Sequence, residues 1–296
     1  MITCDFDYIK PADLSALNLI LSQRAGAMLL AGGHALLPEM KLRRLRPGLL
    51  VDLAGIGELR GIQHHGANVT IGAMVTSADI ERSEDLARYV PLLPLAAKVI
   101  SDPLIRNRAT IGGSLAQADP RGDWPAVALA SGATLHLSGP SGTRQVSVDS
   151  FFRADEHWIS AASEPAKRTD LGPGELIVAI SIPVVDARTR QTYSKRMHPA
   201  SGYAVIGVAV SIDLDEQHRC VACRIGITGA GAIATRARGV EERLLGEKLT
   251  EKSIKSAASA AAAGIQFVGD SFESADYRKQ LLPIFVRRAI FGIAGA

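Results

Sequence analysis

The sequence predicts an α+β protein built from two domains. Its 296 residues exceed the usual length of a single domain. A polar stretch at residues 164–174 crowds two prolines and two glycines together, which is typical of a boundary. Beyond it, four strand-like runs precede three helical runs, and strands followed by helices indicate an antiparallel sheet covered by helices. We therefore expect domains at residues 1–172 and 173–296.

The first domain is predicted to open with a small parallel α/β unit. Apolar residues at near-helical spacing predict a helix over 11–25, and Gly26 stands where a helix-ending glycine belongs. Short apolar runs at 27–31 and 49–53 predict two strands with a crossover between them, which suggests parallel pairing. The other elements expected in this domain are a hairpin at 61–65 and 68–71 and helices at 91–100 and 126–131.

The second domain is predicted to hold a sheet and a helical C-terminal part. Apolar runs predict the strands, and helical spacing predicts the segments that follow them. The alanine-rich part of the second of these helices is explained by helix propensity and close packing. The expected strands are 176–182, 191–195, 204–214 and 221–228, and the expected helices are 238–245, 251–263 and 275–291.

Composition and charge exclude several classes of protein. A net charge of +3 with scattered Lys and Arg residues offers no electrostatic footprint for nucleic acid. The basic run 41–46 is interpreted as a solvated or docking surface. No apolar run approaches the roughly 20 residues of a membrane-spanning helix. The first residues resemble no export signal, so we expect a cytoplasmic protein.

Three cysteines indicate a reducing compartment without a disulfide framework. Cys220 and Cys223 have C-x-x-C spacing but lie in a predicted strand, where positions three apart point to opposite faces. We therefore expect buried structural thiols there. With Cys4 as the third, the chain lacks the four thiolates that an iron–sulfur cluster usually takes.

Two further patterns are set aside. Gly229-x-Gly231-x-x-Ala234 follows an apolar strand and matches a dinucleotide fingerprint, but helices follow it where a second parallel strand is required. No nicotinamide site is expected there. His64 and His65 lie on a predicted hairpin strand and face opposite ways, so we expect surface histidines and no shared metal ion.

Two glycine pairs, Gly32-Gly33 and Gly112-Gly113, are the strongest candidates for a binding site. Glycine allows the backbone to approach a ligand closely, and successive N–H groups can then converge on an anion. Each pair taken alone is more simply explained as an ordinary turn or helix cap. Together they predict two walls of one phosphate-binding cleft.

The ordered segments around these pairs resemble the FAD-binding medium subunit of molybdenum hydroxylases, which include the carbon monoxide dehydrogenase and xanthine dehydrogenase families. The resemblance extends from the glycine pairs to the C-terminal helix and covers nearly the whole chain. The segments that carry it are 31–41, 50–53, 110–116, 118–120, Asp123, 175–177, 193–195, 203–209, 277–278 and 287–289.

The resemblance implies a two-part FAD-binding domain of the PCMH or vanillyl-alcohol-oxidase type, with subdomains at about 1–56 and 57–172, followed by an α+β C-terminal domain. It also implies an electron-transfer subunit that takes electrons from iron–sulfur clusters of a small partner and passes them to an external acceptor. A large partner would oxidise the substrate at a molybdenum–pterin centre, in a dimer of heterotrimers. Neither a catalytic residue nor a metal ligand is expected in this chain.

Two other functions are compatible with the sequence. A stand-alone FAD-dependent oxidase or reductase of the same fold would need its own acid–base pair. A flavin-free scaffold subunit of the same fold would be colourless and would still bind the partner subunits. The substrate is not readable from this chain, and the acceptor is open among quinone, oxygen, a ferredoxin-like protein and a nicotinamide.

The resemblance also implies FAD contacts for particular residues. Backbone donors of 29–36 and 110–114 would hold the pyrophosphate and ribityl chain, and Asp123 would accept from the adenosine-ribose hydroxyls. Ile177 would pack near the adenine or the ring system, and Lys195 near the polar edge of the isoalloxazine, where a cation stabilises reduced flavin. The expected contact residues are Leu29, Leu30, Ala31, Gly32, Gly33, His34, Ala35, Leu36, Thr110, Ile111, Gly112, Gly113, Ser114, Asp123, Ile177 and Lys195.

Simpler roles for three of these residues are a helix-cap Asp, a core Ile and a surface Lys. The chain also departs from the family pattern at three places. Ala35 stands where a serine is common, Ala109 where a glycine is common, and residues 198–202 replace an Arg and an Asp. These departures affect the tuning of the flavin and its acceptor rather than FAD binding itself.

Overall fold

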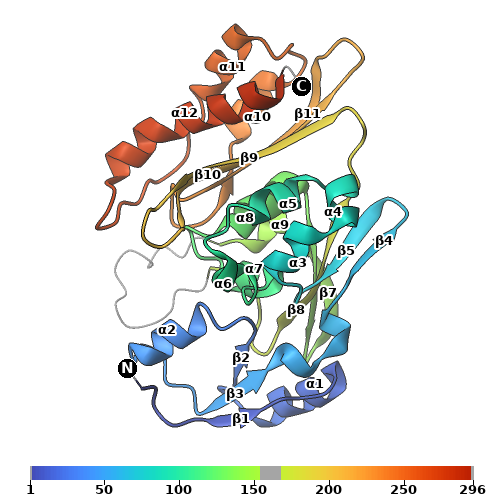
Figure 1. Cartoon of the computed structure of the whole chain (residues 1–296), viewed down its shortest axis with the longest axis vertical. Helices are drawn as coiled ribbons and strands as arrows, with labels where there is room; N and C mark the ends of the chain where they lie inside the picture. Colours follow the sequence, from blue (N-terminus) through green and yellow to red (C-terminus); the bar gives the residue numbers. More distant parts are fainter. Residues whose placement is uncertain (1, 154–167, 295–296) are drawn as a thin grey trace.

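The computed structural model describes residues 2–153 and 168–294 and arranges them as three units, one above another (Figure 1). Each unit has its own apolar core. The N-terminal unit lies at one end, the middle unit carries most of the short helices, and the C-terminal unit lies at the other end.

The N-terminal unit is a parallel sheet of three strands in the order β1-β3-β2. Its strands are β1 (Asp7–Ile9), β2 (Met28–Leu30) and β3 (Leu49–Asp52), with α1 (Leu14–Gln23) and α2 (Leu36–Lys41) in the connections. Asp13 begins α1 by accepting a hydrogen bond from the N–H of Ala16. The predicted helix, both predicted strands and their parallel pairing are confirmed, whereas β1 was not expected.

The middle unit is an antiparallel sheet of five strands in the order β4-β5-β8-β6-β7. Short helices pack against one face and share the largest core with it. The strands are β4 (Ile62–His65), β5 (Asn68–Gly72), β6 (Thr134–Gly139), β7 (Gly142–Ser147) and β8 (Leu176–Pro183). The helices are α3 (Ser77–Arg82), α4 (Glu84–Tyr89), α5 (Leu92–Ala97), α6 (Pro103–Arg106), α7 (Ile111–Gln117), α8 (Asp123–Ser131) and α9 (Val148–Phe151). Two short 3-10 helices, η1 (Leu53–Gly55) and η2 (Gly57–Leu59), precede β4 and bury Leu53 and Leu59 in the core of the N-terminal unit.

Strand β8 belongs to a different sheet from the one in which it was expected. The sequence placed residues 176–182 in the second domain, but β8 pairs with β5 on one side and β6 on the other. Ile180, for example, aligns with Ile71 of β5 and with Leu135 of β6. The strand expected at 176–182 therefore belongs to the middle sheet and lies at its centre, while residues 164–167 of the turn-rich stretch lie outside the described residues.

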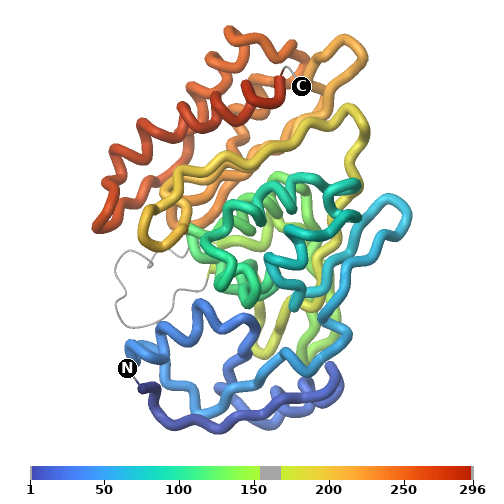
Figure 2. The backbone as a smooth tube through the Cα atoms, viewed as in Figure 1, coloured from blue at the N-terminus to red at the C-terminus, as the bar shows by residue number. Residues whose placement is uncertain are grey.

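The C-terminal unit is an antiparallel sheet in the order β12-β11-β10-β9, with helices on its outer face (Figure 2). Its elements are β9 (Thr189–Met197), β10 (Ala204–Leu214), β11 (Cys220–Thr228), β12 (Thr235–Arg236), α10 (Arg238–Leu244), α11 (Glu251–Ala258) and α12 (Ala275–Ala294). This agrees with the predicted succession of strands and helices. Because β12 pairs antiparallel with β11, the fingerprint at 229–234 does not belong to a βαβ unit.

The expected burial of Cys220 and Cys223 is confirmed, but a β-bulge in β11 corrects the expectation that they point to opposite faces. Cys220 pairs with Leu214 and Ala222 with Asp213, so one extra residue lies between them. Val221 is exposed while Cys220 and Cys223 are both buried. The thiols therefore face the same core, and their mutual hydrogen bond together with burial raises the pKa of Cys223 well above its ordinary value.

Helix α8 joins the middle and C-terminal units. All nine of its residues are buried, as expected for a helix covered on every side. A Cβ at Gly226 of β11 would lie 2.0 Å from the carbonyl oxygen of Ala126, so only glycine allows this approach. Among the described residues, no helix is both long and apolar enough to cross a membrane.

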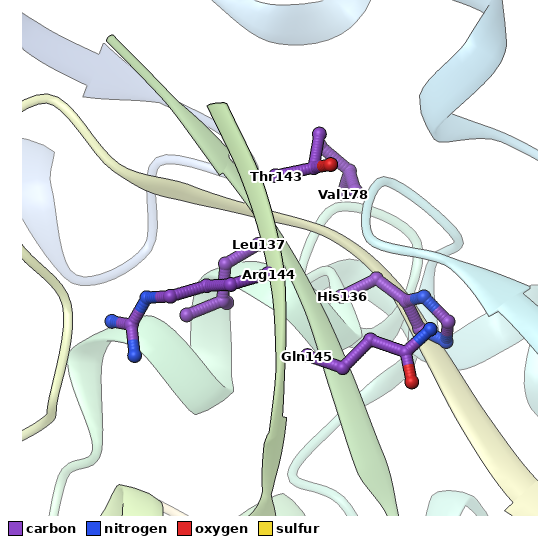
Figure 3. A pocket seen from close by; sticks show the side chains of 6 residues that line it. All are labelled: His136, Leu137, Thr143, Arg144, Gln145 and Val178. Carbon is purple, nitrogen blue, oxygen red and sulfur yellow. The ribbon is translucent and has the colours of Figure 1, made fainter. Parts of the chain in front are cut away.

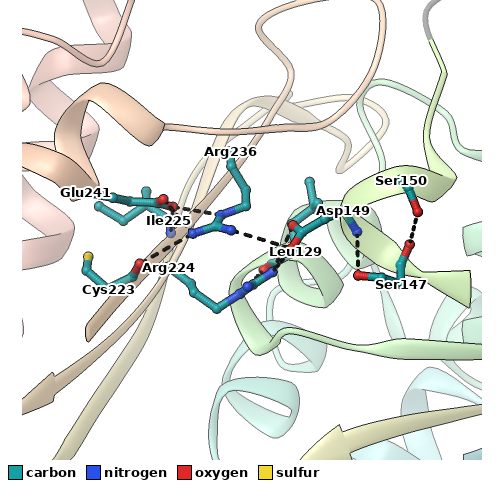
Figure 4. A network of polar contacts seen from close by, with 9 residues as sticks. All are labelled: Leu129, Ser147, Asp149, Ser150, Cys223, Arg224, Ile225, Arg236 and Glu241. Carbon is teal, nitrogen blue, oxygen red and sulfur yellow. Dashed lines mark hydrogen bonds and ion pairs between the residues drawn. The ribbon is translucent and has the colours of Figure 1, made fainter. Parts of the chain in front are cut away.

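A polar network strengthens the same junction (Figure 4). Both carboxylate oxygens of Asp149 on α9 accept hydrogen bonds of 2.8 Å from Arg224 on β11. Arg224 also donates to the carbonyl oxygen of Leu129 at 2.9 Å, and Arg236 lies 3.5 Å from Asp149. Two arginines of the C-terminal unit therefore contact one carboxylate of the middle unit.

Replacing Arg224 by alanine is expected to lower the free energy of unfolding by about 1.5–3 kcal/mol, since it removes charge-assisted hydrogen bonds between the units. Urea unfolding followed by circular dichroism measures the change. Arg188→Ala is the matched control, because Arg188 forms an exposed ion pair of 3.5 Å with Asp186 and its loss is expected to cost less than about 0.5 kcal/mol. Equal losses in the two variants would contradict a role for the network.

Candidate functional site

The two glycine pairs lie side by side. Gly32 follows β2, and a Cβ on it would lie 2.2 Å from the carbonyl oxygen of Arg108. A Cβ on Gly113 would lie 3.2 Å from the Cβ of Ala31. The absence of side chains thus allows segments from two different units to approach each other closely.

The first glycine segment presents unused backbone donors. Gly33 has a φ of +81°, which turns the chain between β2 and α2. Within the described ranges, the N–H groups of residues 33–36 donate no hydrogen bond, and Ala35 offers no side-chain cap to α2. His34 and Ala35 are exposed. Successive free N–H groups of this kind suit an anionic ligand such as a pyrophosphate.

The second glycine segment differs from the first, because most of its N–H groups are already occupied. Ile111 donates to the carbonyl of Val75 and Gly112 to that of Ala73, at 3.1 and 2.9 Å. Gly113 donates to the hydroxyl of Thr110, which begins α7. In the part of the chain that the structure describes, the N–H of Thr110 is the one in this segment that donates no hydrogen bond, and Gly112 and Gly113 present a surface without side chains.

Gly112 is explained by packing. A Cβ there would lie 2.4 Å from the Cβ of Ala73, so α7 could not lie against the end of β5.

Four other predicted contact residues of the two glycine segments are partly exposed. Ser114 of α7 is half-buried. Leu29 and Leu30 belong to β2, Leu36 begins α2, and all three are partly buried.

Asp123 and Lys195 form a buried ion pair. The Nζ of Lys195 lies 2.9 Å from Oδ2 of Asp123, with side-chain exposures of 2% and 6%. Tyr193 donates its hydroxyl to the other carboxylate oxygen, and Lys195 also donates to the carbonyl of Val99 at 3.1 Å. Burial raises the pKa of Asp123, while Lys195 and Tyr193 oppose that rise.

Two of the simpler roles are therefore wrong. Lys195 is not a surface lysine, and Asp123 is the first residue of α8 rather than its cap, a position held by Gly122. Ile177 is 4% exposed and aligns with Leu137 in the main core, which agrees with a core residue. The structure brings Asp123 and Lys195 into direct contact, although the resemblance assigned them to different parts of FAD.

Sequence reasoning missed Tyr193. It lies two positions before Lys195 in β9, and residues two apart in a strand share a face. That spacing was the available signal. Burial and the neighbouring carboxylate raise the pKa of Tyr193 well above its ordinary value, so its hydroxyl remains a donor.

A separate cavity of about 470 Å³ lies on the middle sheet and is lined by residues of β6, β7 and β8 (Figure 3). His136 and Gln145 point to one side and Arg144 to the other. Arg144 is occupied by ion pairs with Asp170 and Glu175, at 2.8 and 2.7 Å. No residue of the glycine pairs lines this cavity.

Two family profiles match the chain. One, described as the FAD binding domain in molybdopterin dehydrogenase, matches residues 4–185, and one described as the CO dehydrogenase flavoprotein C-terminal domain matches residues 191–292. The first match ends just after β8 and the second begins within β9, so the two matches cover different sheets.

Individual relatives agree with the profiles over the full length. The carbon monoxide dehydrogenase medium chain of Hydrogenophaga pseudoflava is 36% identical and covers 98% of this chain and 97% of its own. The same protein of Afipia carboxidovorans is 34% identical with the same coverage. A solved structure of carbon monoxide dehydrogenase from Hydrogenophaga pseudoflava, which lacks the Mo-pyranopterin moiety, matches with a TM-score of 0.92 and 37% identity, covering 100% of this chain and 99% of that one. This chain therefore belongs to the FAD-binding medium subunits of the molybdenum hydroxylases, a family of oxidoreductase subunits.

Proposed function

We propose that this chain is the electron-transfer subunit of a cytoplasmic molybdenum hydroxylase complex. It takes electrons from iron–sulfur clusters of a small partner subunit and delivers them to an external acceptor. Substrate is oxidised at a molybdenum–pterin centre on a large partner, in a dimer of heterotrimers. Support comes from the family and from relatives named as medium chains, and the three free cysteines agree with a reducing compartment.

The observation that carries the proposal is the run of free N–H groups at 33–36 beside the side-chain-free wall at Gly113. A pyrophosphate bound there would receive several charge-assisted hydrogen bonds without a lysine. Bound FAD would supply the redox chemistry between the small subunit and the external acceptor. This chain's residues hold the cofactor and set its electrostatic surroundings.

Asp123 and Lys195 are proposed to act on the cofactor as one unit, since a direct ion pair joins them. The carboxylate fixes the position of the ammonium group, and Tyr193 fixes the carboxylate. The ammonium group of Lys195 would favour the reduced, anionic form of a flavin beside it, and the paired carboxylate of Asp123 would moderate that effect. Ile177 contributes by packing from the core of the middle unit.

A visible spectrum of the purified full chain, alone and assembled with its partner subunits, tests the proposal. We expect bands of oxidised flavin that bleach with dithionite, and FAD in the released chromophore. Protein that remains colourless in both forms would refute FAD binding. Substrate turnover by the chain alone would instead support a stand-alone oxidase or reductase.

A further inference from the structure

A row of three residues crosses the face of the C-terminal sheet that meets α8. Gly207 of β10 aligns with Lys195 of β9 on one side and Thr228 of β11 on the other. Lys195 bonds to Asp123, as described above. Thr228 contacts the turn directly before Asp123, so both side chains of the row hold the start of α8.

Thr228 is completely buried and makes two short contacts with that turn. Its hydroxyl oxygen lies 2.8 Å from the carbonyl oxygen of Pro120 and 2.8 Å from that of Gly122. The N–H of Gly229 donates to Pro120 at 2.7 Å, and the N–H of Ala204 donates to Arg121 at 3.1 Å. Three successive carbonyl groups of the middle unit are therefore bound by the C-terminal unit.

Gly207 shows how closely Thr228 and Tyr193 fit together. A Cβ at Gly207 would lie 2.4 Å from the hydroxyl of Tyr193 and 2.7 Å from the methyl group of Thr228. The two side chains thus fill the space that a side chain at Gly207 would take. Tyr193 orients the carboxylate of Asp123, and Thr228 orients the backbone that leads into it.

The same turn adjoins the second glycine segment. A Cβ at Gly122 would lie 3.8 Å from the hydroxyl oxygen of Ser114 on α7. A shift of the turn would therefore change the position of Asp123 relative to that segment. Gly122 caps α8 without a side-chain hydrogen bond, so its position depends on its backbone neighbours.

We propose that Thr228 is a positioning residue for the flavin site. Its hydroxyl holds the turn 120–122, and through it the start of α8, so that the C-terminal unit sets where the Asp123–Lys195 pair meets the cofactor. The proposal rests on the proposed FAD-binding function of the glycine segments.

Thr228→Val and Thr228→Ser test the role of the hydroxyl. Valine keeps the shape but removes the hydroxyl proton that Pro120 and Gly122 share, so we expect the affinity for FAD to fall about three- to tenfold. Flavin fluorescence titration of the full chain, assembled with its partner subunits, measures this affinity. The absorption spectrum of bound flavin is expected to shift as well. Serine keeps the hydroxyl group, so Thr228→Ser is expected to retain the wild-type affinity for FAD and the wild-type spectrum. Thr143→Val, at an exposed position of β7, is the control and should change neither.

Wild-type affinity and spectrum in Thr228→Val would overturn the proposal, and so would a serine variant as impaired as the valine one. If the valine variant does not fold, Thr228→Ala is compared with Thr228→Ser by the same two readouts. Failure of the proposed function gives a different result, because the wild-type chain would then bind no FAD. Retention of FAD by Gly32→Val would refute the glycine site while leaving the readout at Thr228 intact.

Discussion

Gly32→Ala is expected to lower FAD affinity by more than about tenfold. The added methyl group would lie 2.2 Å from the carbonyl oxygen of Arg108 and 3.0 Å from the Cα of Ala109. Both are backbone atoms that cannot rotate away. The two segments must separate, and overpacking of this kind costs about 1–3 kcal/mol, which is enough to displace a bound pyrophosphate.

Fluorescence titration with FAD measures the effect, and thermal unfolding of the FAD-free chain separates loss of the site from loss of the fold. Gly48→Ala is the matched control in the same unit, since a Cβ there would meet no atom within 4 Å. It is expected to bind FAD like the wild type. FAD binding by Gly32→Ala at wild-type strength would show that the close approach of the two segments does not shape the cofactor site.

Lys195→Met is expected to destabilise the folded chain by about 3–5 kcal/mol at neutral pH. Methionine fills similar space but leaves the carboxylate of Asp123 buried at 6% exposure without its cation. Removing one partner of a buried ion pair is costly for this reason. The double variant Lys195→Met with Asp123→Asn removes both charges and is expected to recover much of the loss.

The stability of Lys195→Met is expected to depend on pH, because the variant lacks the cation beside Asp123. Burial already raises the pKa of Asp123 above that of the unfolded chain, and loss of Lys195 raises it further. At a pH between the unfolded pKa of about 3.9 and the higher folded pKa, the carboxyl group of Asp123 is protonated in the folded chain and ionised in the unfolded chain. Lys195→Met should therefore gain stability as pH falls through this interval.

Urea unfolding at pH 7 and pH 5 measures both effects. Lys255→Met, on the exposed side of α11, serves as the control and should change stability by less than about 0.5 kcal/mol. A Lys195→Met chain as stable as the wild type at pH 7 would mean that Asp123 finds another partner or is protonated in the native protein.

Local patterns in the sequence were sufficient for most of the elements. The parallel unit around β2 and β3, the hairpin of β4 and β5 and the C-terminal helices follow from apolar spacing, which acts over a few residues. Strands β6 and β7 were not expected. Strand β8 was recognised but assigned to the wrong sheet, because strand pairing joins residues far apart in the chain and leaves no local period.

Some features of the candidate site were likewise determined by the sequence, and others only by the tertiary structure. The sequence by itself determined the two glycine pairs, the family and FAD as the cofactor, because these depend on residue identity and order. Only the tertiary structure decided that residues 33–36 keep their donors free, that Asp123 and Lys195 are paired, and that Thr228 holds the turn before them. The physical reason is that hydrogen bonds and burial are settled by which distant segments meet, and a bulge such as that at Cys220 can reverse which face a side chain takes.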